Sequence, residues 1–222
     1  MTAAIAGVLQ RAVERQGSCS LLLSGGSTPR ASYELLAARF RDRVPWKQVH
    51  LFWGDERFVL PDDPRSNARM ARGALVDHVP CPPANVHPIP TVLPSADSAA
   101  RRYEDTLRAQ FPGDRPAFDL ALLGLGEDAH TASIFPGSPA LVEQARWVMA
   151  VTAPAEPPRR ITLTMPALTA AAQLFVLVSG AGKAEALRRA LDPASPPARY
   201  PAAALQGAAG RVVWWADRAA AP

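Results

Sequence analysis

Polar residues that could do chemistry follow directly after an apolar run in the middle of the chain. The run covers residues 120–125, and Asp128, His130, Thr131 and Ser133 come after it. A buried strand that ends in glycine and then in polar residues is typical of an α/β sheet, which presents its chemistry at the carboxyl ends of its strands. Because a neutral imidazole can act as a general base near neutral pH, His130, the only histidine read at a strand end, is the first catalytic candidate.

Two interpretations of Asp128 stay open, since it could orient the His130 ring or cap the following turn. The Asp-x-His spacing is also compatible with a metal, but no further ligand cluster accompanies it, which disfavours a metal site. The chain has no Gly-x-Ser-x-Gly elbow, so a serine hydrolase is disfavoured as well. Water activated by His130 is the better fit for a hydrolase, and we interpret Thr131 and Ser133 as turn and helix-start residues.

A glycine-rich turn, Ser24 to Pro29, links a predicted strand over residues 18–23 to a predicted helix. Thr28 is a natural N-cap and Pro29 suits the first helical position. Glycines let the backbone approach an anion, and the start of a helix favours negative charge. The turn is therefore a candidate phosphate site, although a tight turn that merely caps a helix would look the same.

A second turn of this kind, Ser179 to Lys183, follows a predicted strand over residues 174–178. It carries Lys183, and lysine often serves as the point charge that binds a phosphate. Its spacing matches neither a Walker loop nor a dinucleotide fingerprint. A third polar cluster, Trp53 to Phe58, follows a predicted strand over residues 49–52, and we interpret it as a charged loop. Such clusters after several strands favour one shared site.

The elements that must position these residues alternate between strands and helices. We find no internal repeat and no domain boundary, so we predict one domain over residues 1–222. Its fold class is α/β, a three-layer Rossmann-like sandwich with a mainly parallel central sheet. The patterns predict helices over residues 2–15, 29–40, 66–76, 96–111, 166–172 and 184–191, and strands over 18–23, 49–52, 86–89, 120–125, 147–152, 161–164, 174–178 and 212–215.

Composition narrows the function classes. The chain has 222 residues, 48% of them hydrophobic, and a formal net charge of +4. No basic run is interleaved with aromatic residues, so nucleic acid is not an expected partner. The two cysteines lack metal-ligand spacing, charged residues interrupt the first helix, and no apolar run reaches the roughly 18 residues of a membrane span. We expect a cytoplasmic protein without a signal peptide that binds no membrane, and the positive charge fits either solvated arginines or an anion site.

Six segments, in order, resemble the motifs of bacterial 6-phosphogluconolactonases between about Leu21 and Leu191. The resemblance implies a Rossmann-like α/β sandwich shared with sugar-phosphate isomerases. It also implies hydrolysis of 6-phospho-D-glucono-1,5-lactone in the oxidative pentose phosphate pathway, without a metal or organic cofactor. The segments are LSGGSTPR, HLFWGDERFV, SNARMAR, GLGEDAHTASIFPGSPAL, RRITLTMPAL and SGAGKAEAL.

The resemblance also implies roles for individual residues. His130 would be the general base for the attacking water and Asp128 its neighbour in the motif. The implied substrate- and phosphate-binding residues are Gly26, Ser27, Thr28, Asp55, Arg57, Arg160 and Lys183. The expected partner is the small phosphosugar lactone, and we expect a monomer or a weak homo-oligomer.

The chain departs from the pattern at three places. Ala129 stands where relatives have glycine, so a positive φ there would strain the backbone. Ala68 replaces a frequent aromatic residue, which we expect to alter a wall of the site. Relatives usually have an edge strand before the first helix, whereas this chain starts inside that helix, which suggests a trimmed start.

Two rival functions remain. A glucosamine-6-phosphate deaminase is disfavoured because residues 133–136 lack an acid, and a non-catalytic sugar-phosphate sensor would need a DNA-binding segment.

Overall fold

A parallel sheet lies at the centre of the computed structural model, which describes residues 1–221. Its six strands run in the order β4-β2-β1-β5-β8-β9, and all their pairings are parallel. This order brings the carboxyl ends of β1, β5 and β8 together at one edge, although they are far apart in the sequence. The strands are β1 (Cys19–Leu23), β2 (Val49–Trp53), β4 (Val86–His87), β5 (Leu120–Gly124), β8 (Gln173–Val178) and β9 (Arg211–Ala216).

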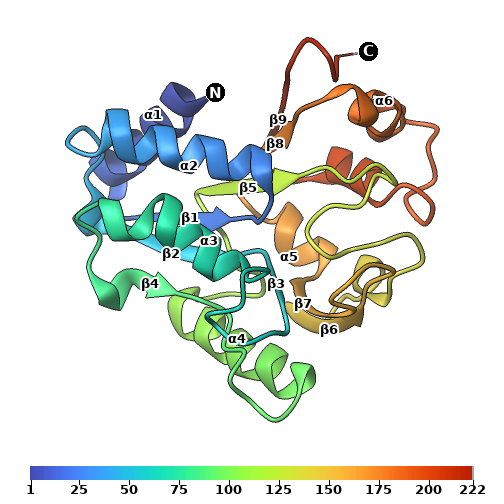
Figure 1. Ribbon diagram of the computed structural model, residues 1–222, viewed down its shortest axis with the longest axis horizontal. Coiled ribbons are helices and arrows are strands. Elements are labelled where there is room, and N and C mark those ends of the chain that lie inside the picture. Colours follow the sequence, from blue (N-terminus) through green and yellow to red (C-terminus); the bar gives the residue numbers. More distant parts are fainter. Residues whose placement is uncertain (222) are drawn as a thin grey trace.

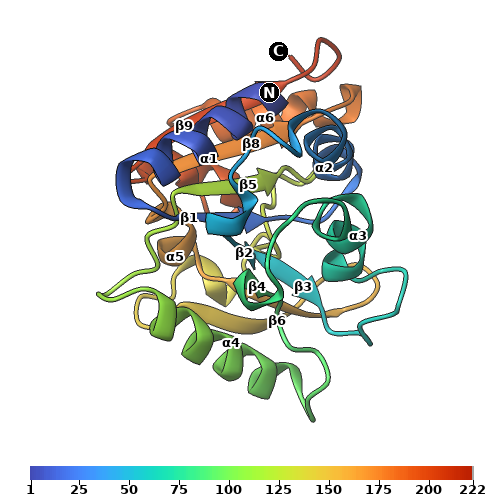
Figure 2. The same cartoon turned by 90° about the vertical axis from the view of Figure 1, so that its left-hand side faces the viewer.

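Helices cover both faces of this sheet. Figure 2 shows α1 and α2 on one side of it and α4 and α5 on the other. The helix α1 ends at Gly17, whose φ of 82° gives the left-handed C-cap that glycine favours. The α-helices are α1 (Thr2–Gln16), α2 (Ser27–Phe40), α3 (Asn67–Ala74), α4 (Ala96–Gln110), α5 (Met165–Thr169) and α6 (Ala184–Leu191).

A second, antiparallel sheet of three strands lies beside α4 (Figure 1). In this sheet β7 (Arg159–Leu163) lies between β3 (Asp55–Arg57) and β6 (Val148–Thr152). The pairing of β3 with β7 sets Arg57 opposite Arg160. Short 3-10 helices connect the other elements, at Trp46–Gln48, Val76–His78, Pro83–Asn85, Pro139–Leu141, Ala181–Lys183 and Pro201–Gly207.

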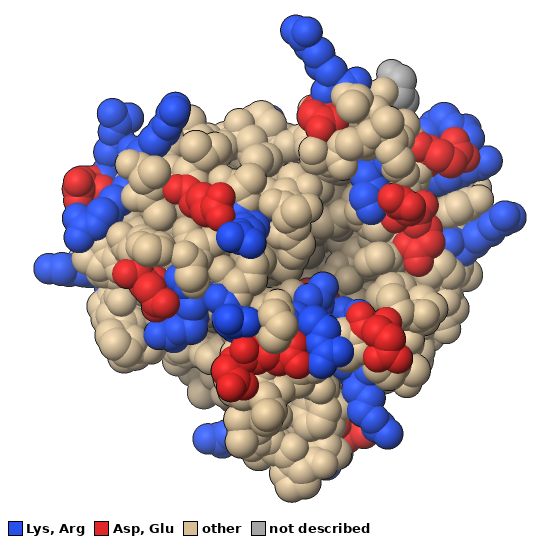
Figure 3. Space-filling view, viewed as in Figure 1, with Lys and Arg blue, Asp and Glu red and all other residues tan. Residues whose placement is uncertain are grey.

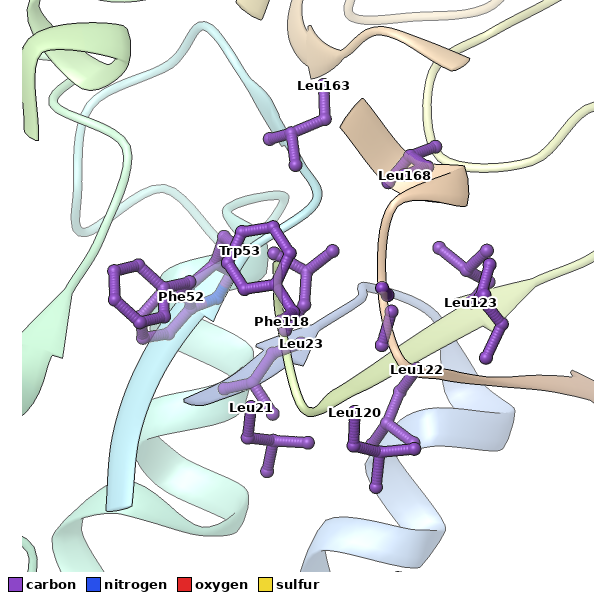
Figure 4. Close-up of a cluster of buried hydrophobic side chains, with 14 of the residues drawn as sticks. Leu21, Leu23, Phe52, Trp53, Phe118, Leu120, Leu122, Leu123, Leu163 and Leu168 are labelled. Carbon is purple, nitrogen blue, oxygen red and sulfur yellow. The ribbon is translucent and has the colours of Figure 1, made fainter. Parts of the chain in front are cut away.

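The hydrophobic core covers both faces of the parallel sheet, with Leu9 of α1 on one side and Leu163 of β7 on the other. Figure 4 shows Leu21, Leu122 and Trp53 from the parallel sheet together with Leu163 of β7 and Leu168 of α5. All five side chains have no exposed surface. Fully burying such a side chain stabilises the fold by roughly 1.5–3 kcal/mol, so the core holds the second sheet firmly against the first.

The structure confirms the α/β class with a mainly parallel central sheet and corrects several local expectations. The charged cluster after β2 is not a loop, because residues 55–57 form β3. The helix expected at Pro29 begins at Ser27, with Gly26 (φ 106°) as N-cap and no side-chain cap from Thr28. The helix expected to reach residue 76 ends at Ala74. Predicting one mainly parallel sheet also missed the separate antiparallel one.

Candidate active site

A cavity of about 420 Å³ opens where β1, β5 and β8 end. Figure 3 shows a hollow at the centre of one face, with lysine or arginine side chains at its border. The walls come from both sheets, since β3 and β7 contribute as well. Of the nine predicted site residues, eight line the cavity: Gly26, Ser27, Thr28, Asp55, Arg57, His130, Arg160 and Lys183. Asp128 lies behind His130 rather than on the wall.

The His130 ring is held from two sides. Its Nδ1 donates a hydrogen bond of 2.5 Å to Asp128 Oδ1, and it packs against the Phe135 ring with 4.4 Å between centroids. A Cβ at Gly126 would overlap the His130 ring, so the close approach requires glycine there. With Nδ1 used by Asp128, the lone pair of Nε2 remains for a proton from the cavity. Asp128 thus orients the ring, one of the two interpretations that the sequence left open.

The carboxyl group of Asp128 has a pKa below its usual value. Partial burial raises this pKa, but the hydrogen bond and the charge of His130 outweigh that effect. Asp128 is therefore ionised at neutral pH and accepts the Nδ1 proton. Since an ionised acceptor fixes which ring nitrogen carries the proton, the tautomer suited to base catalysis is built into the loop.

The loop that carries His130 bends through two left-handed alanines. Ala129 has φ 61° and Ala132 has φ 48°. The condition under which alanine would be strained at position 129 is therefore met, and alanine occupies this conformation at a cost of order 1–3 kcal/mol. The Ala129 side chain is fully buried, and its carbonyl accepts from the backbone N–H of Ala202. Contacts around the loop thus hold a geometry that alanine alone disfavours.

The glycine turn after β1 is fixed by a tyrosine. The hydroxyl of Tyr33, in α2, accepts from the N–H of Ser24 and donates to its carbonyl, both at 2.9 Å. Beyond Ser24, the turn presents Gly26 and the first turn of α2 to the cavity. Unpaired N–H groups at a helix start favour an anion there, which supports the predicted phosphate site.

Three cationic side chains face the same cavity. Burial lowers the pKa of Arg160, and the nearby positive charge of Arg57 lowers it further. Arg160 donates to the carbonyl of Pro157 at 2.6 Å, and Arg57 donates to that of Arg65 at 2.6 Å. Neither guanidinium has a carboxylate partner among the salt bridges of residues 1–221. With Lys183 on the β8 side, the cavity concentrates positive charge suited to a phosphate.

Two functional-site residues were not anticipated from the sequence. Asn67, the first residue of α3, lines the cavity and donates to Asp55. Ser133 was expected at a helix start, but it lies in a turn and donates its hydroxyl to Asp55 at 2.6 Å. A hydroxyl or amide that bonds across the fold leaves no local spacing signal, so only the three-dimensional structure could identify these residues.

The expectation for Ala68 is wrong. This residue does not form a wall of the His130 cavity but lines a separate, more apolar cavity of about 480 Å³ beside Trp53 and Ile89. Its backbone N–H donates to Glu56, which also accepts from the N–H of Asn67 at the start of α3. The predicted uniqueness of His130 also needs correction, because His87 ends β4; its ring bonds to His50 and stacks on Phe52 instead.

Between residues 1 and 221, no group of three or more His, Cys, Asp or Glu side chains could hold a metal ion. In the same span, none of the helices combines the length and apolar character needed to cross a membrane.

Comparison with known proteins identifies the family of the chain. A family described as "Glucosamine-6-phosphate isomerases/6-phosphogluconolactonase" matches residues 1–214. The chain belongs to this family. The 6-phosphogluconolactonase of Synechocystis sp. is 42% identical over 215 residues, which cover 96% of this chain and 87% of that protein. The Mycobacterium tuberculosis 6-phosphogluconolactonase is 43% identical over 226 residues, with coverages of 98% and 90%. The resemblance drawn from the six motifs is confirmed.

Solved structures of the family agree. The 6-phosphogluconolactonase from Trypanosoma brucei superposes with a TM-score of 0.86 at 32% identity and covers 99% of this chain and 92% of that one. A monomeric glucosamine-6-phosphate deaminase superposes with a TM-score of 0.83 at 22% identity, with coverages of 99% and 93%. The second likeness shows only that the two proteins share the fold, so it does not revive the deaminase rival.

Proposed function

We propose that this chain is a 6-phosphogluconolactonase, which hydrolyses 6-phospho-D-glucono-1,5-lactone to 6-phospho-D-gluconate in the oxidative pentose phosphate pathway. The observation that carries the proposal is one cavity with an oriented histidine and three cationic side chains. A phosphosugar lactone needs both features, because its phosphate must be held while water attacks its carbonyl carbon. Relatives at 42–43% identity that bear this name support the same reaction.

In the proposed mechanism His130 acts on water. Nε2 takes a proton as the water oxygen attacks the lactone carbonyl, while Asp128 accepts from Nδ1 and stabilises the imidazolium that forms. The tetrahedral intermediate then collapses, and the bond from the carbonyl carbon to the ring oxygen breaks. The imidazolium returns its proton to that oxygen, which becomes a hydroxyl of the product. One histidine thus serves as base and then as acid.

Binding in this proposal uses the two glycine-rich turns. Gly26, Ser27 and Thr28 offer N–H groups at the start of α2, and Lys183 and Arg160 supply charge. Asp55, on the same wall, is an acceptor suited to a sugar hydroxyl. Arg57 and the free N–H groups of the turns are the positive groups available to the developing oxyanion. The proposed reaction uses no metal ion or organic cofactor.

The expected compartment and oligomeric state are also part of the proposal. Cys19 and Cys81 are free thiols, which fits the proposed location in the reducing cytoplasm. We also propose that the protein is a monomer or a weak homo-oligomer.

The decisive experiment follows 6-phosphogluconate formation by the purified protein after subtraction of the spontaneous hydrolysis. The same assay uses the unphosphorylated lactone as the comparison substrate. We expect a kcat/KM at least about 100-fold higher for the phosphorylated lactone, since a charge-assisted phosphate contact contributes roughly 1.5–3 kcal/mol and several are available. Equal rates on both lactones, or binding of the lactone without turnover, would contradict the proposed function; the second outcome would favour a sensor.

A further inference from the structure

We propose that Ser133 and Asn67 are positioning residues that hold Asp55 between the glycine turn and the His130 loop. They thereby set the distance between the phosphate-binding turn and His130, the general base. This inference rests on the proposed function, because it assigns a task within the same cavity. Its basis is a chain of buried hydrogen bonds that connects Asn67, Asp55 and Ser133, which come after β3, β2 and β5 in the sequence.

The Asp55 carboxyl group has a partner at each oxygen. Ser133 Oγ donates to Oδ2 at 2.6 Å, and Asn67 Nδ2 donates to Oδ1 at 3.2 Å and to the Asp55 carbonyl at 3.0 Å. The exposed fractions are 6% for Asp55, 2% for Asn67 and 1% for Ser133. Hydrogen bonds to a buried charged group are stronger than those in water, so these contacts fix the carboxylate in one orientation.

Asn67 reaches the glycine turn on its other side. A Cβ at Gly25 would overlap the Asn67 carboxamide, so the side chain occupies space that only glycine leaves open. The start of α3 is itself fixed by Glu56, which accepts from the N–H groups of Asn67 and Ala68, both at 2.7 Å. Asn67 is therefore a rigid spacer between the phosphate turn and Asp55.

Ser133 makes the corresponding connection to the His130 loop. Besides its hydroxyl contact, its N–H donates to Thr162 Oγ1 at 3.3 Å, which ties the loop to β7. Ser133 lies three residues after His130, and Thr131 Oγ1 anchors the intervening turn to the Gly124 carbonyl at 2.9 Å. The His130 loop thus leaves the parallel sheet and is fastened to the antiparallel one through Ser133.

The consequence for catalysis is geometric. The general base stands on the parallel sheet, whereas Asp55, Arg57 and Arg160 stand on the antiparallel one. Without the Ser133 hydroxyl the loop keeps its fold near Gly124 but loses its fastening to Asp55. A displacement of about 1 Å can lower a rate by roughly 100-fold, so kcat should respond much more than phosphate binding.

The test is a double-mutant cycle with Ser133→Ala and Asp55→Ala. We expect Ser133→Ala to lower kcat on the phosphorylated lactone by about 10- to 100-fold, while the Kd for inorganic phosphate changes less than about twofold. In the Asp55→Ala background the same change should cost less than about twofold, because its target is gone. The control is Ser195→Ala, a buried serine whose hydroxyl has no hydrogen-bond partner in residues 1–221, and it should leave kcat unchanged.

Two results overturn the inference: wild-type kcat in Ser133→Ala, or an equal loss with and without Asp55. If Ser133→Ala fails to fold, Asn67→Ala provides the second arm, and it should lower kcat and also weaken phosphate binding. If the wild-type protein lacks lactonase activity, the proposed function fails by itself. The network is then tested by hydrogen exchange, where Ser133→Ala should speed exchange of amides in residues 126–135 and Ser195→Ala should not; unchanged exchange would refute it.

Discussion

The hydroxyl of Tyr103 clamps the last residue of β2: it accepts from the Trp53 N–H at 2.8 Å and donates to the Trp53 carbonyl at 3.0 Å. Tyr103 stands on α4 and is fully buried, and burial raises its pKa. The short strand β4 pairs only with Leu51 and Phe52, so the tyrosine completes the hydrogen bonding that β4 does not reach. Asp55 follows two residues later, so this clamp fixes the point from which the charged strand β3 extends to the cavity.

Replacing this clamp should destabilise the fold. Tyr103→Phe leaves a buried N–H and a buried carbonyl unpaired, and each costs roughly 1–3 kcal/mol. We expect the free energy of unfolding, measured by urea titration, to fall by about 2–6 kcal/mol. Tyr200→Phe is the control, since Tyr200 is only partly buried and stacks with Arg189 and Arg199. Equal stability of both variants would show that the Trp53 groups find other partners.

His130→Asn should separate catalysis from binding. Loss of a positioned general base typically lowers a rate by about 100- to 10,000-fold. We expect kcat on the phosphorylated lactone to fall in this range while the Kd for inorganic phosphate stays within about twofold, because the cationic residues are untouched. Single-turnover assays with calorimetric phosphate titration measure both quantities. A variant with near-wild-type kcat would remove His130 from its assigned role.

The histidine pair at the other end of the sheet makes stability depend on pH. His50 Nδ1 lies 3.2 Å from His87 Nε2. Burial lowers the pKa of both rings from 6.5, and the charge of His50 lowers that of His87 further. The unfolded chain therefore binds protons more readily, so the stabilisation is present above about pH 6.5 and is lost as the pH falls through the folded-state values. Urea titrations at several pH values should show this loss, and His87→Gln should reduce it; an unchanged slope would argue against the pair.

The left-handed alanine at position 129 should tolerate glycine but not valine. Ala129→Gly relieves strain of order 1–3 kcal/mol. It also removes a buried methyl group worth about 0.8 kcal/mol and raises the conformational entropy of the unfolded chain, which costs about 0.4–1 kcal/mol of stability. We expect the unfolding free energy of this variant to lie between about 1 kcal/mol below and about 2 kcal/mol above that of the wild type. Ala129→Val adds a branched side chain at positive φ in a fully buried place and should cost more than about 2 kcal/mol. Equal denaturation midpoints for glycine and valine would contradict the strained geometry.

The sequence predicted most of the parallel sheet because its strands are short apolar runs bounded by glycine or polar residues. It also predicted His130 and the two glycine-rich turns, whose geometry follows from local chain direction. The strand β3 was missed because Asp55, Glu56 and Arg57 have no apolar alternation, and their pairing with β7 is a long-range contact. Local patterns cannot report a strand whose stabilising partner lies a hundred positions away.

The site was predicted incompletely for the same physical reason. Asn67 and Ser133 act through side-chain contacts with Asp55 across the fold, and neither sits in a motif of ligand spacing. Ala68 was expected at a wall of the site because relatives often carry an aromatic residue there, but it faces the other cavity, whereas its neighbour Asn67 faces the His130 cavity. On a helix, adjacent residues differ in direction by about 100°, so position in a motif does not fix the surface that a residue covers.

The strand order has a consequence for how the chain acquires its shape during synthesis. Leu21 of β1 pairs with Leu120 of β5, so the edge of β1 stays unpaired until the ribosome has made more than half of the protein. Open strand edges attract other chains, and long-range pairing is slow. The nascent amino-terminal half is therefore the stage most exposed to aggregation, and insertion of β5 both closes that edge and delivers the loop that carries His130.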